Sequence, residues 1–187
     1  VNNSWGAYTD TDDMDFTCWV NQFNTGTDAD SVLVDELAYT YGASWIFSAG
    51  NNGRCREDDG ELTPSLGTPG VAKNVITVGS FRPMTTMHQR SDFSSAGPTG
   101  DGRAKPDVVA PGAQITSADY LDDEGYVIRS GTSMAAPHVA GVAAVMRQKQ
   151  PEPTGAEIYK QQLDGATEGA IDQLGGSPNL LLYKDCA

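Results

Sequence analysis

The chain has 187 residues, 39% of them hydrophobic, and this length and apolar content fit one globular domain. The formal net charge of −13 argues against a nucleic-acid partner, because phosphates are repelled by an acidic surface. No stretch approaches the roughly 18 apolar residues that a membrane span needs, so the sequence excludes both a nucleic-acid-binding and a membrane-spanning domain.

The first half of the chain predicts strands and one helix. A strand covers about residues 2–6, and short apolar strands follow at 45–49 and 75–78. Residues 28–41 are predicted to form a helix that ends before Gly42, a residue typical of helix C-termini. The apolar spacing predicts that the inward face of this helix holds Val32, Leu33, Leu37 and Tyr41.

The second half predicts three further strands and two helices. The strands cover residues 108–110, 114–116 and 126–128. A helix is expected over 132–149, with an inward face formed by Val139, Val142, Ala143 and Met146. The last helix begins at Thr154, because Thr154 and Glu157 have the spacing of a capping box. Strands that alternate with helices predict an α/β layered fold with a mostly parallel sheet.

Ser133 is the most informative residue, because a turn of small residues delivers it to the first turn of an apolar helix. The run from 130 to 141 reads Ser-Gly-Thr-Ser-Met-Ala-Ala-Pro-His-Val-Ala-Gly. Unpaired N–H groups at a helix N-terminus favour negative charge beside the hydroxyl, and Gly131 would let a substrate backbone approach closely. This placement suits a nucleophile. Taken alone, however, the Gly-Thr-Ser pattern favours a helix that merely starts with capping residues.

The full run resembles the serine segment of the subtilisin-like serine proteases, the subtilases. Other stretches resemble segments of that family in the same order, namely residues 3–6, 48–51, 67–79, 93–98, 105–112 and 176–183. The last of these is similar to the end of proteinase K-like domains. The resemblance implies a three-layer subtilisin-like fold. It identifies residues 1–187 as the carboxy-terminal portion of a single catalytic domain that here lacks its amino-terminal part.

The resemblance also implies roles for individual residues. Ser133 would attack a peptide carbonyl, while the Asn51 amide and the Ser133 N–H stabilise the oxyanion and the Thr132 hydroxyl lends support. From the residues alone, a turn former in the run from Gly50 to Gly53 is the favoured interpretation of Asn51. An extended peptide substrate would lie along a strand edge and place one side chain between two walls, and the residues expected there are Ser4, Trp5, Gly6, Ser48, Ala49, Gly50 and Gly67.

The histidine that would act as general base and the aspartate that would orient it are expected outside these residues. The triad of this family runs Asp, His, Ser along the chain, and no segment here resembles those of the Asp and the His. We therefore expect both on a missing amino-terminal part or a companion chain, which would be the main partner. His138 lies roughly 140° around the helix from Ser133 and is expected to pack structurally. His88, in a polar loop, is expected to be a solvated surface residue.

The cysteines and one proline give two further expectations, a disulfide and a cis peptide. In the resembled sheet the loops of Cys18 and Cys55 emerge at one edge, which predicts a disulfide and leaves Cys186 for the missing part. Three free thiols are the alternative, although the secretion usual in this family favours bridges. The resemblance also suggests a cis peptide between Thr68 and Pro69.

The chemistry requires no cofactor, but a structural cation is expected. Asp107 and the carbonyls of Lys73 and Val75 resemble a calcium site of proteinase K-like members. Acidic clusters at 10–15, 57–61 and 122–124 are expected to be solvated loops, with cation binding or a preference for basic substrates as the alternative.

Two alternatives to a serine endopeptidase stay open. One is an inactive subtilase-like scaffold that only binds its partner. The other is a transpeptidase or peptide ligase, because an amine can capture an acyl-enzyme in place of water.

Overall fold

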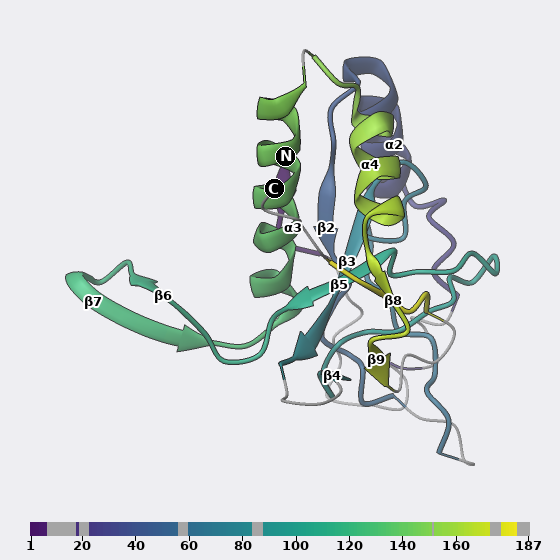
Figure 1. Cartoon of the computed structure of the whole chain (residues 1–187). Helices are drawn as coiled ribbons and strands as arrows, with labels where there is room; N and C mark the ends of the chain where they lie inside the picture. Colours follow the sequence, from purple (N-terminus) through teal and green to yellow (C-terminus); the bar gives the residue numbers. More distant parts are fainter. Residues whose placement is uncertain are drawn as a thin grey trace.

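A largely parallel β-sheet forms the centre of the molecule (Figure 1). The computed structural model describes residues 1–6, 18, 23–55, 60–83, 88–150, 152–172 and 177–182. Within these ranges the main path of the sheet runs in the order β1 (Asn2–Asn3), β2 (Ile46–Ser48), β3 (Ile76–Arg82), β5 (Val108–Pro111), β10 (Leu180–Leu181) and β8 (Thr167–Glu168). Neighbours are parallel as far as β10, and β8 is antiparallel to it. The predicted mostly parallel sheet is therefore confirmed.

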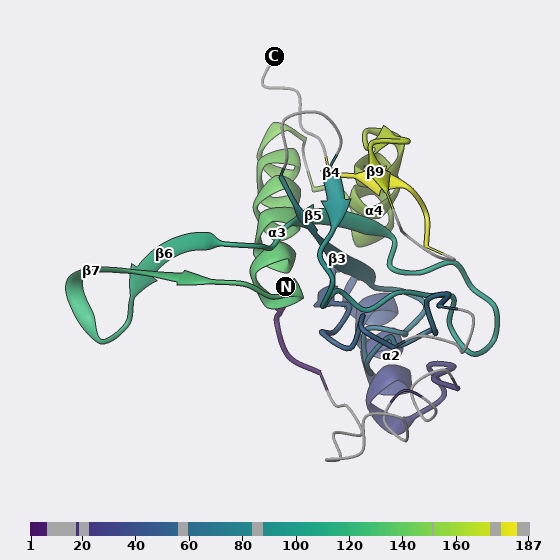
Figure 2. The same cartoon turned by 90° about the horizontal axis from the view of Figure 1, so that it is seen from below.

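Four further strands lie outside this path. β4 (His88–Arg90) pairs antiparallel with the end of β3 and parallel with β9 (Ile171–Asp172). β6 (Ile115–Asp119) and β7 (Asp122–Arg129) form a separate antiparallel hairpin. Both views show this hairpin projecting away from the rest of the chain (Figures 1 and 2). Its exposed apolar side chains are Tyr120, Leu121, Tyr126 and Ile128.

Helices cover both faces of the sheet and produce three layers. α3 (Thr132–Lys149) and α4 (Gly155–Asp164) lie on one face, and α2 (Ala29–Tyr41) lies on the other (Figure 2). The alternation of side chains along β2 explains this division. Ile46 packs in the core beneath α3 and α4, whereas Phe47 packs with Val34 of α2. Both strand residues are fully buried, as the short apolar run predicts for a strand covered on two sides.

Capping residues set the helix ends where the sequence placed them. Asp28 accepts a hydrogen bond from Ser31 N at 2.9 Å, and Gly42 ends α2 in the left-handed region. Thr154 and Glu157 form the predicted capping box at the start of α4. α3 spans the predicted residues 132–149. None of the helices in the described ranges is long and apolar enough to cross a bilayer.

The inward face predicted for α2 is wrong. Val32 and Leu33 are each 52% exposed and Tyr41 is 72% exposed. Val34 instead packs against Phe47, Ala72 and Val75, and the small residues Ser31 and Ala38 share its buried face. The small side chains of Ser31 and Ala38 let the helix lie close to the sheet. The larger apolar side chains of Val32, Leu33 and Tyr41 lie on its exposed side.

Several strand boundaries also differ from the prediction. β1 ends at Asn3 rather than near Gly6, while β3 continues to Arg82. Both strands of the hairpin are longer than expected, since β6 reaches Asp119 and β7 begins at Asp122. Acidic residues and a glycine fill the added start of β7, so hydrophobic periodicity gave no signal for it.

A disulfide joins Cys18 and Cys55, and the peptide between Thr68 and Pro69 is cis, as the resemblance implied. Cys186 lies outside the described residues. The bridge links positions 37 residues apart, so we expect a Cys18→Ser, Cys55→Ser double variant to lose about 2–4 kcal/mol of unfolding free energy. Urea denaturation of both proteins measures this difference. A loss within about 0.5 kcal/mol of zero, the range of neutral surface substitutions, would contradict the expectation.

Candidate active site

Ser133 lies in the first turn of α3, beside the first residues of the chain. Its Oγ donates a hydrogen bond to the Ser4 carbonyl at 3.1 Å, and the Ser4 hydroxyl donates to the Ser133 carbonyl at 2.9 Å. The residue before α3, Gly131, has no side chain that could cap the helix, so the Ser133 N–H lacks a capping partner. The half-buried serine thus combines a reachable hydroxyl with the positive end of a helix.

Thr132 fixes the orientation of the Asn51 side chain. Asn51 Oδ1 accepts hydrogen bonds from Thr132 N at 3.0 Å and from Thr132 Oγ1 at 3.1 Å. The Thr132 hydroxyl in turn accepts a hydrogen bond from Gly50 N at 3.2 Å. Because the amide oxygen is engaged twice, the Nδ2 group is left to donate to an approaching oxygen.

The two expected oxyanion donors border the same small space beside Gly131. A methyl group placed on Gly131 would lie 3.6 Å from Asn51 Nδ2 and 3.7 Å from Ser133 N, with Met134 Sδ also at 3.6 Å. An oxygen atom that enters this space would lie beside both groups, an arrangement that suits the binding of an oxyanion.

Gly131→Ala is expected to fill this space without unfolding the protein. The methyl group would make ordinary van der Waals contacts, and the φ of 161° is extended backbone that alanine adopts. We expect kcat/KM towards a peptide to fall by about 10²-fold, as for the loss of one oxyanion donor, while Tm stays within about 2 °C. Unchanged kcat/KM in a folded variant would show that the oxyanion binds elsewhere.

Buried Arg90 supports the loop that carries Asn51, a role that the sequence analysis missed. Its guanidinium donates to the carbonyls of Ser91, Ser94 and Gly53, the last only two residues after Asn51. An arginine within a polar segment gives no sequence signal of burial, so the contact becomes visible only in the folded chain.

The residues expected to bind substrate lie near Ser133, and their role stays a prediction. Trp5 is 54% exposed, its ring packs edge-on against Phe47, and its Nε1 donates to Asn3 Oδ1 at 3.2 Å. Gly6, the next expected substrate contact, is half-buried. Of the expected pocket walls, Ser48, Ala49 and Gly50 are buried. Gly67 N donates directly to the Ala49 carbonyl at 3.0 Å, so the two walls are joined at this point.

A groove next to Ser133 runs between the hairpin and α3. It is lined by Ile115, Thr116 and Ser117 of β6 and by Ser133, Met134, Pro137 and His138 of α3. His138 was expected to pack structurally against the helix, but its side chain is exposed along this groove. Its Nδ1 shares a 2.8 Å hydrogen bond with the Met134 carbonyl, so its ring is engaged by the helix backbone rather than by the serine hydroxyl.

His88 also lies apart from the serine. It belongs to β4 and is half-buried, with its ring centroid 4.9 Å from that of Phe81, rather than in a solvated loop. The start of that expected loop, residues 84–87, lies outside the described residues. The chain has two histidines, and the contacts given above join His138 to the Met134 carbonyl and His88 to the Phe81 ring rather than to the Ser133 hydroxyl.

The residues expected to bind calcium hold an ammonium group. Lys105 Nζ lies 2.5 Å from Asp107 Oδ2 and 2.8 Å from the Val75 carbonyl, while the Tyr159 hydroxyl donates to Asp107 Oδ1 at 2.8 Å. Calcium needs such oxygens free to coordinate it. Asp107, Val75 and Lys73 as they stand therefore do not fit a calcium ion. The available signal was a lysine two residues before the aspartate, near enough along the chain for its ammonium group to reach the carboxylate.

The acidic clusters lie partly outside the described residues, namely 10–15 and 57–59. The third cluster, at 122–124, is exposed on β7. Across the described ranges no group of three or more His, Cys, Asp or Glu side chains could hold a metal ion.

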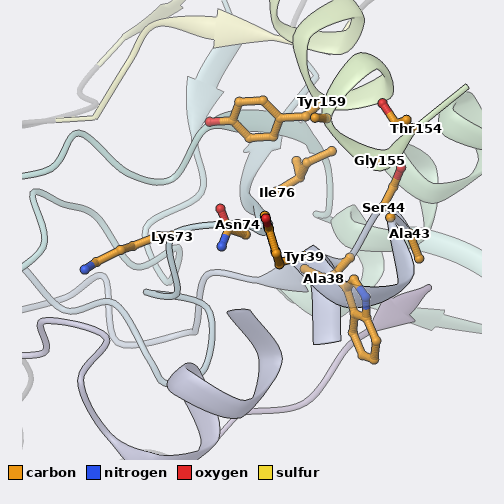
Figure 3. A pocket seen from close by; sticks show the side chains of 13 residues that line it. Ala38, Tyr39, Ala43, Ser44, Lys73, Asn74, Ile76, Thr154, Gly155 and Tyr159 are labelled. Atoms are coloured by element: carbon orange, nitrogen blue, oxygen red, sulfur yellow. The ribbon is translucent and has the colours of Figure 1, made fainter. Parts of the chain in front are cut away.

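A further cavity lies at the opposite end of the strands (Figure 3). It opens between the end of α2, the start of α4 and the residues just before β2 and β3, and its lining includes Tyr39, Ser44, Asn74, Ile76, Thr154 and Tyr159. No residue expected to act in catalysis or substrate binding lines it, so it is separate from the serine site.

Known proteins share this sequence and architecture. The model of the subtilase family matches residues 1–177. Over 145 residues the chain is 38% identical to pyrolysin from Pyrococcus furiosus, covering 65% of this chain and 10% of that protein. Over 157 residues it is 39% identical to alkaline serine exoprotease A from Vibrio alginolyticus, covering 82% of this chain and 26% of that protein.

A solved structure described as a cold adapted subtilisin-like serine proteinase matches 81% of this chain with 34% identity and a TM-score of 0.64. That match covers 49% of the solved chain, so the present chain spans less than half the length of each of these relatives. The family match and the shared fold together show that the chain belongs to the subtilase family.

Proposed function

We propose that these 187 residues carry the nucleophile and the oxyanion site of a subtilisin-like serine endopeptidase. A histidine and an aspartate from a polypeptide outside these residues would complete the triad. The observation that supports this most is the arrangement at the start of α3. There the Ser133 N–H and Asn51 Nδ2 border one open space beside a serine hydroxyl.

The proposed reaction is acyl transfer. Ser133 Oγ attacks the peptide carbonyl carbon while the companion histidine removes the hydroxyl proton. The carbonyl oxygen becomes an oxyanion held by Asn51 Nδ2 and the Ser133 N–H. Collapse of this intermediate breaks the C–N bond, and the histidine returns the proton to the leaving amine. Water then attacks the acyl-enzyme on Ser133 by the same steps and releases the acid.

The hydrogen bond that the Ser133 hydroxyl makes supports a general base that comes from outside the chain. Its acceptor here is the Ser4 backbone carbonyl, which cannot serve as a general base at neutral pH. The groove between β6 and α3 leaves the hydroxyl open on one side, and a segment that enters it could place an imidazole within bonding range.

Two uncovered surfaces support a companion polypeptide in the same region. β1 pairs with β2 on one side and, within the described ranges, with no strand on the other. Parallel sheets are usually covered at such positions. The hairpin beyond α3 exposes four large apolar side chains, Tyr120, Leu121, Tyr126 and Ile128. One polypeptide that adds a strand beside β1 and packs under the hairpin would bury both surfaces.

The proposed substrate is an extended peptide in a secreted setting. Its backbone would pair with residues 4–6, and one side chain would enter between residues 48–50 and Gly67. The disulfide between Cys18 and Cys55 supports an oxidising compartment. No cofactor is needed for the chemistry. Cleavage of matched peptides with Lys, Phe or Leu at the primary position would establish the preference.

A fluorophosphonate probe tests the proposal, because it reacts with an activated serine and not with an ordinary one. The native preparation would be labelled, digested and mapped, and its intact mass would reveal any companion polypeptide. We expect the label on Ser133. A preparation that contains the companion but shows no label at Ser133 would instead favour an inactive binding scaffold. A second assay adds a peptide amine to unlabelled protein from a preparation that reacts with the probe. The product then separates ligation from hydrolysis.

A further inference from the structure

Lys105 and Asp107 form a buried ion pair far from Ser133, at the end of the sheet where β3 and β5 begin. Their side chains are 4% and 5% exposed. Lys105 Nζ bonds to Asp107 Oδ2 and to the Val75 carbonyl, at 2.5 and 2.8 Å. Asp107 Oδ2 also accepts from Thr77 N at 2.6 Å. Nothing in the proposed catalytic chemistry uses this cluster.

The cluster links three separate elements. Val75 directly precedes β3, Asp107 directly precedes β5, and Tyr159 donates from α4 to Asp107 Oδ1 at 2.8 Å. The Tyr159 ring also forms one wall of the cavity at this end of the sheet (Figure 3). Two oxygens from different segments, the Val75 carbonyl and the Asp107 carboxylate, converge on one positive charge, as protein oxygens do at a structural cation site.

Burial and the neighbouring charges act on the Lys105 ammonium group in opposite directions. Besides Asp107, the charged groups that act on Lys105 are Asp35 of α2 and Arg103 in the loop before β5. Burial lowers the pKa of Lys105, while Asp107 opposes this shift by attraction and hydrogen bonding. Burial and the neighbouring Asp107 raise the pKa of Tyr159, which therefore stays a hydrogen-bond donor.

We propose that Lys105 is a built-in counterion that takes the place of a structural cation between β3, β5 and α4. Its ammonium group satisfies the oxygens of Asp107 and Val75 and so excludes calcium from them. The side chain provides from within the protein what a bound ion would provide from solution. Removal of the lysine side chain then uncovers a site for a divalent cation, because the same oxygens lose their partner.

The test compares the wild type with Lys105→Ala in the protein as it is isolated. In a chelator, Lys105→Ala is expected to lower Tm by about 6–20 °C, because Asp107 is left buried without its counter-charge. About 10 mM calcium exceeds the dissociation constants expected for a site with few protein oxygens and should restore about 3–10 °C. Calorimetric titration should show one more calcium bound per chain than in the wild type.

Two further variants serve as controls. The double variant Lys105→Ala, Asp107→Asn keeps the space but removes the carboxylate, so calcium should not raise its Tm. Lys160→Ala removes a lysine from an exposed pair with Asp164, whose side chains are 74% and 61% exposed. This variant should behave like the wild type in chelator and in calcium. Because every comparison is made against the wild type, calcium bound elsewhere on the protein cancels.

Two results would overturn the proposal. The first is a folded Lys105→Ala variant that gains neither calcium nor Tm. The second is a wild-type protein that loses a calcium ion on Asp107→Asn substitution, since calcium would then share the site with Lys105. If Lys105→Ala does not accumulate as folded protein, the second comparison decides alone, and an unchanged calcium stoichiometry in Asp107→Asn supports the counterion.

Discussion

Ser133→Ala is expected to lower kcat by about 10⁶-fold, the loss known for the catalytic serine of subtilisin itself, with Tm nearly unchanged. The side chain makes one hydrogen bond of its own, to the Ser4 carbonyl, and is half-buried, so its removal costs little stability. The chemical step, in contrast, has no other nucleophile. Hydrolysis of a chromogenic peptide by equal amounts of folded protein measures the effect.

Ser130→Ala is the matched control for this substitution. Ser130 lies three residues earlier, and its hydroxyl accepts a hydrogen bond from Gln114 N at 2.9 Å, outside the oxyanion site. Its loss should change kcat by less than about tenfold, since it touches none of the reacting groups. A Ser133→Ala protein that keeps more than about 1% of the wild-type rate would exclude Ser133 as nucleophile, because such residual activity far exceeds that of triad knockouts.

Substitution of Asn51 has the second-largest expected effect. Asn51→Ala should lower kcat by about 10²–10³-fold with little change in KM, a magnitude taken from the equivalent asparagine of subtilisin. Asn51→Asp should lose at least as much. Its carboxylate can still accept the hydrogen bonds of the Thr132 N–H and hydroxyl, yet it presents a negative charge where the oxyanion develops. Steady-state kinetics on one peptide series separate kcat from KM.

Thr132→Val distinguishes a donor role of Asn51 from a purely structural one. This variant removes one of the two hydrogen bonds to Asn51 Oδ1 but leaves the Thr132 N–H and the Asn51 donor in place. We expect a loss of about tenfold in kcat, as for a group that acts by positioning another. If Asn51→Asp and Thr132→Val cost the same, or if the Asn51 variants change only KM, Asn51 does not stabilise the transition state.

Local signals predicted the parts of the fold that depend on neighbours in sequence. The bounds of α3 and the capping box at Thr154 follow from nearby residues and agree with the structure. The inward face of α2 does not, because the packing of Val34 against Phe47 and Val75 decides which side is buried. The largest apolar residues of that helix face outward. Hydrophobic periodicity records how apolar a face is and not what will cover it.

The candidate active site also has parts that nearby residues predict and parts that depend on distant contacts. The position of Ser133 on α3 could be inferred from its own segment, whereas the orientation of Asn51 depends on Thr132, 81 residues away. The support that Arg90 gives to Gly53 spans 37 residues and carries no sequence pattern. The resemblance to subtilases brought Ser133 and Asn51 together before the fold was known. It also suggested calcium at Asp107, where the ammonium group of Lys105 binds the carboxylate instead.

A peptidyl chloromethyl ketone tests the central claim most directly, because this reagent bonds to the serine and alkylates the catalytic histidine in one active site. The treated native protein would be digested and the alkylated histidine located by mass spectrometry. The present chain offers only His88 and His138 as alternatives, so the assignment is unambiguous. The account predicts alkylation of a histidine outside residues 1–187 and none in Ser133→Ala. Alkylation of His88 or His138, or of no histidine while a companion polypeptide is bound, would contradict it.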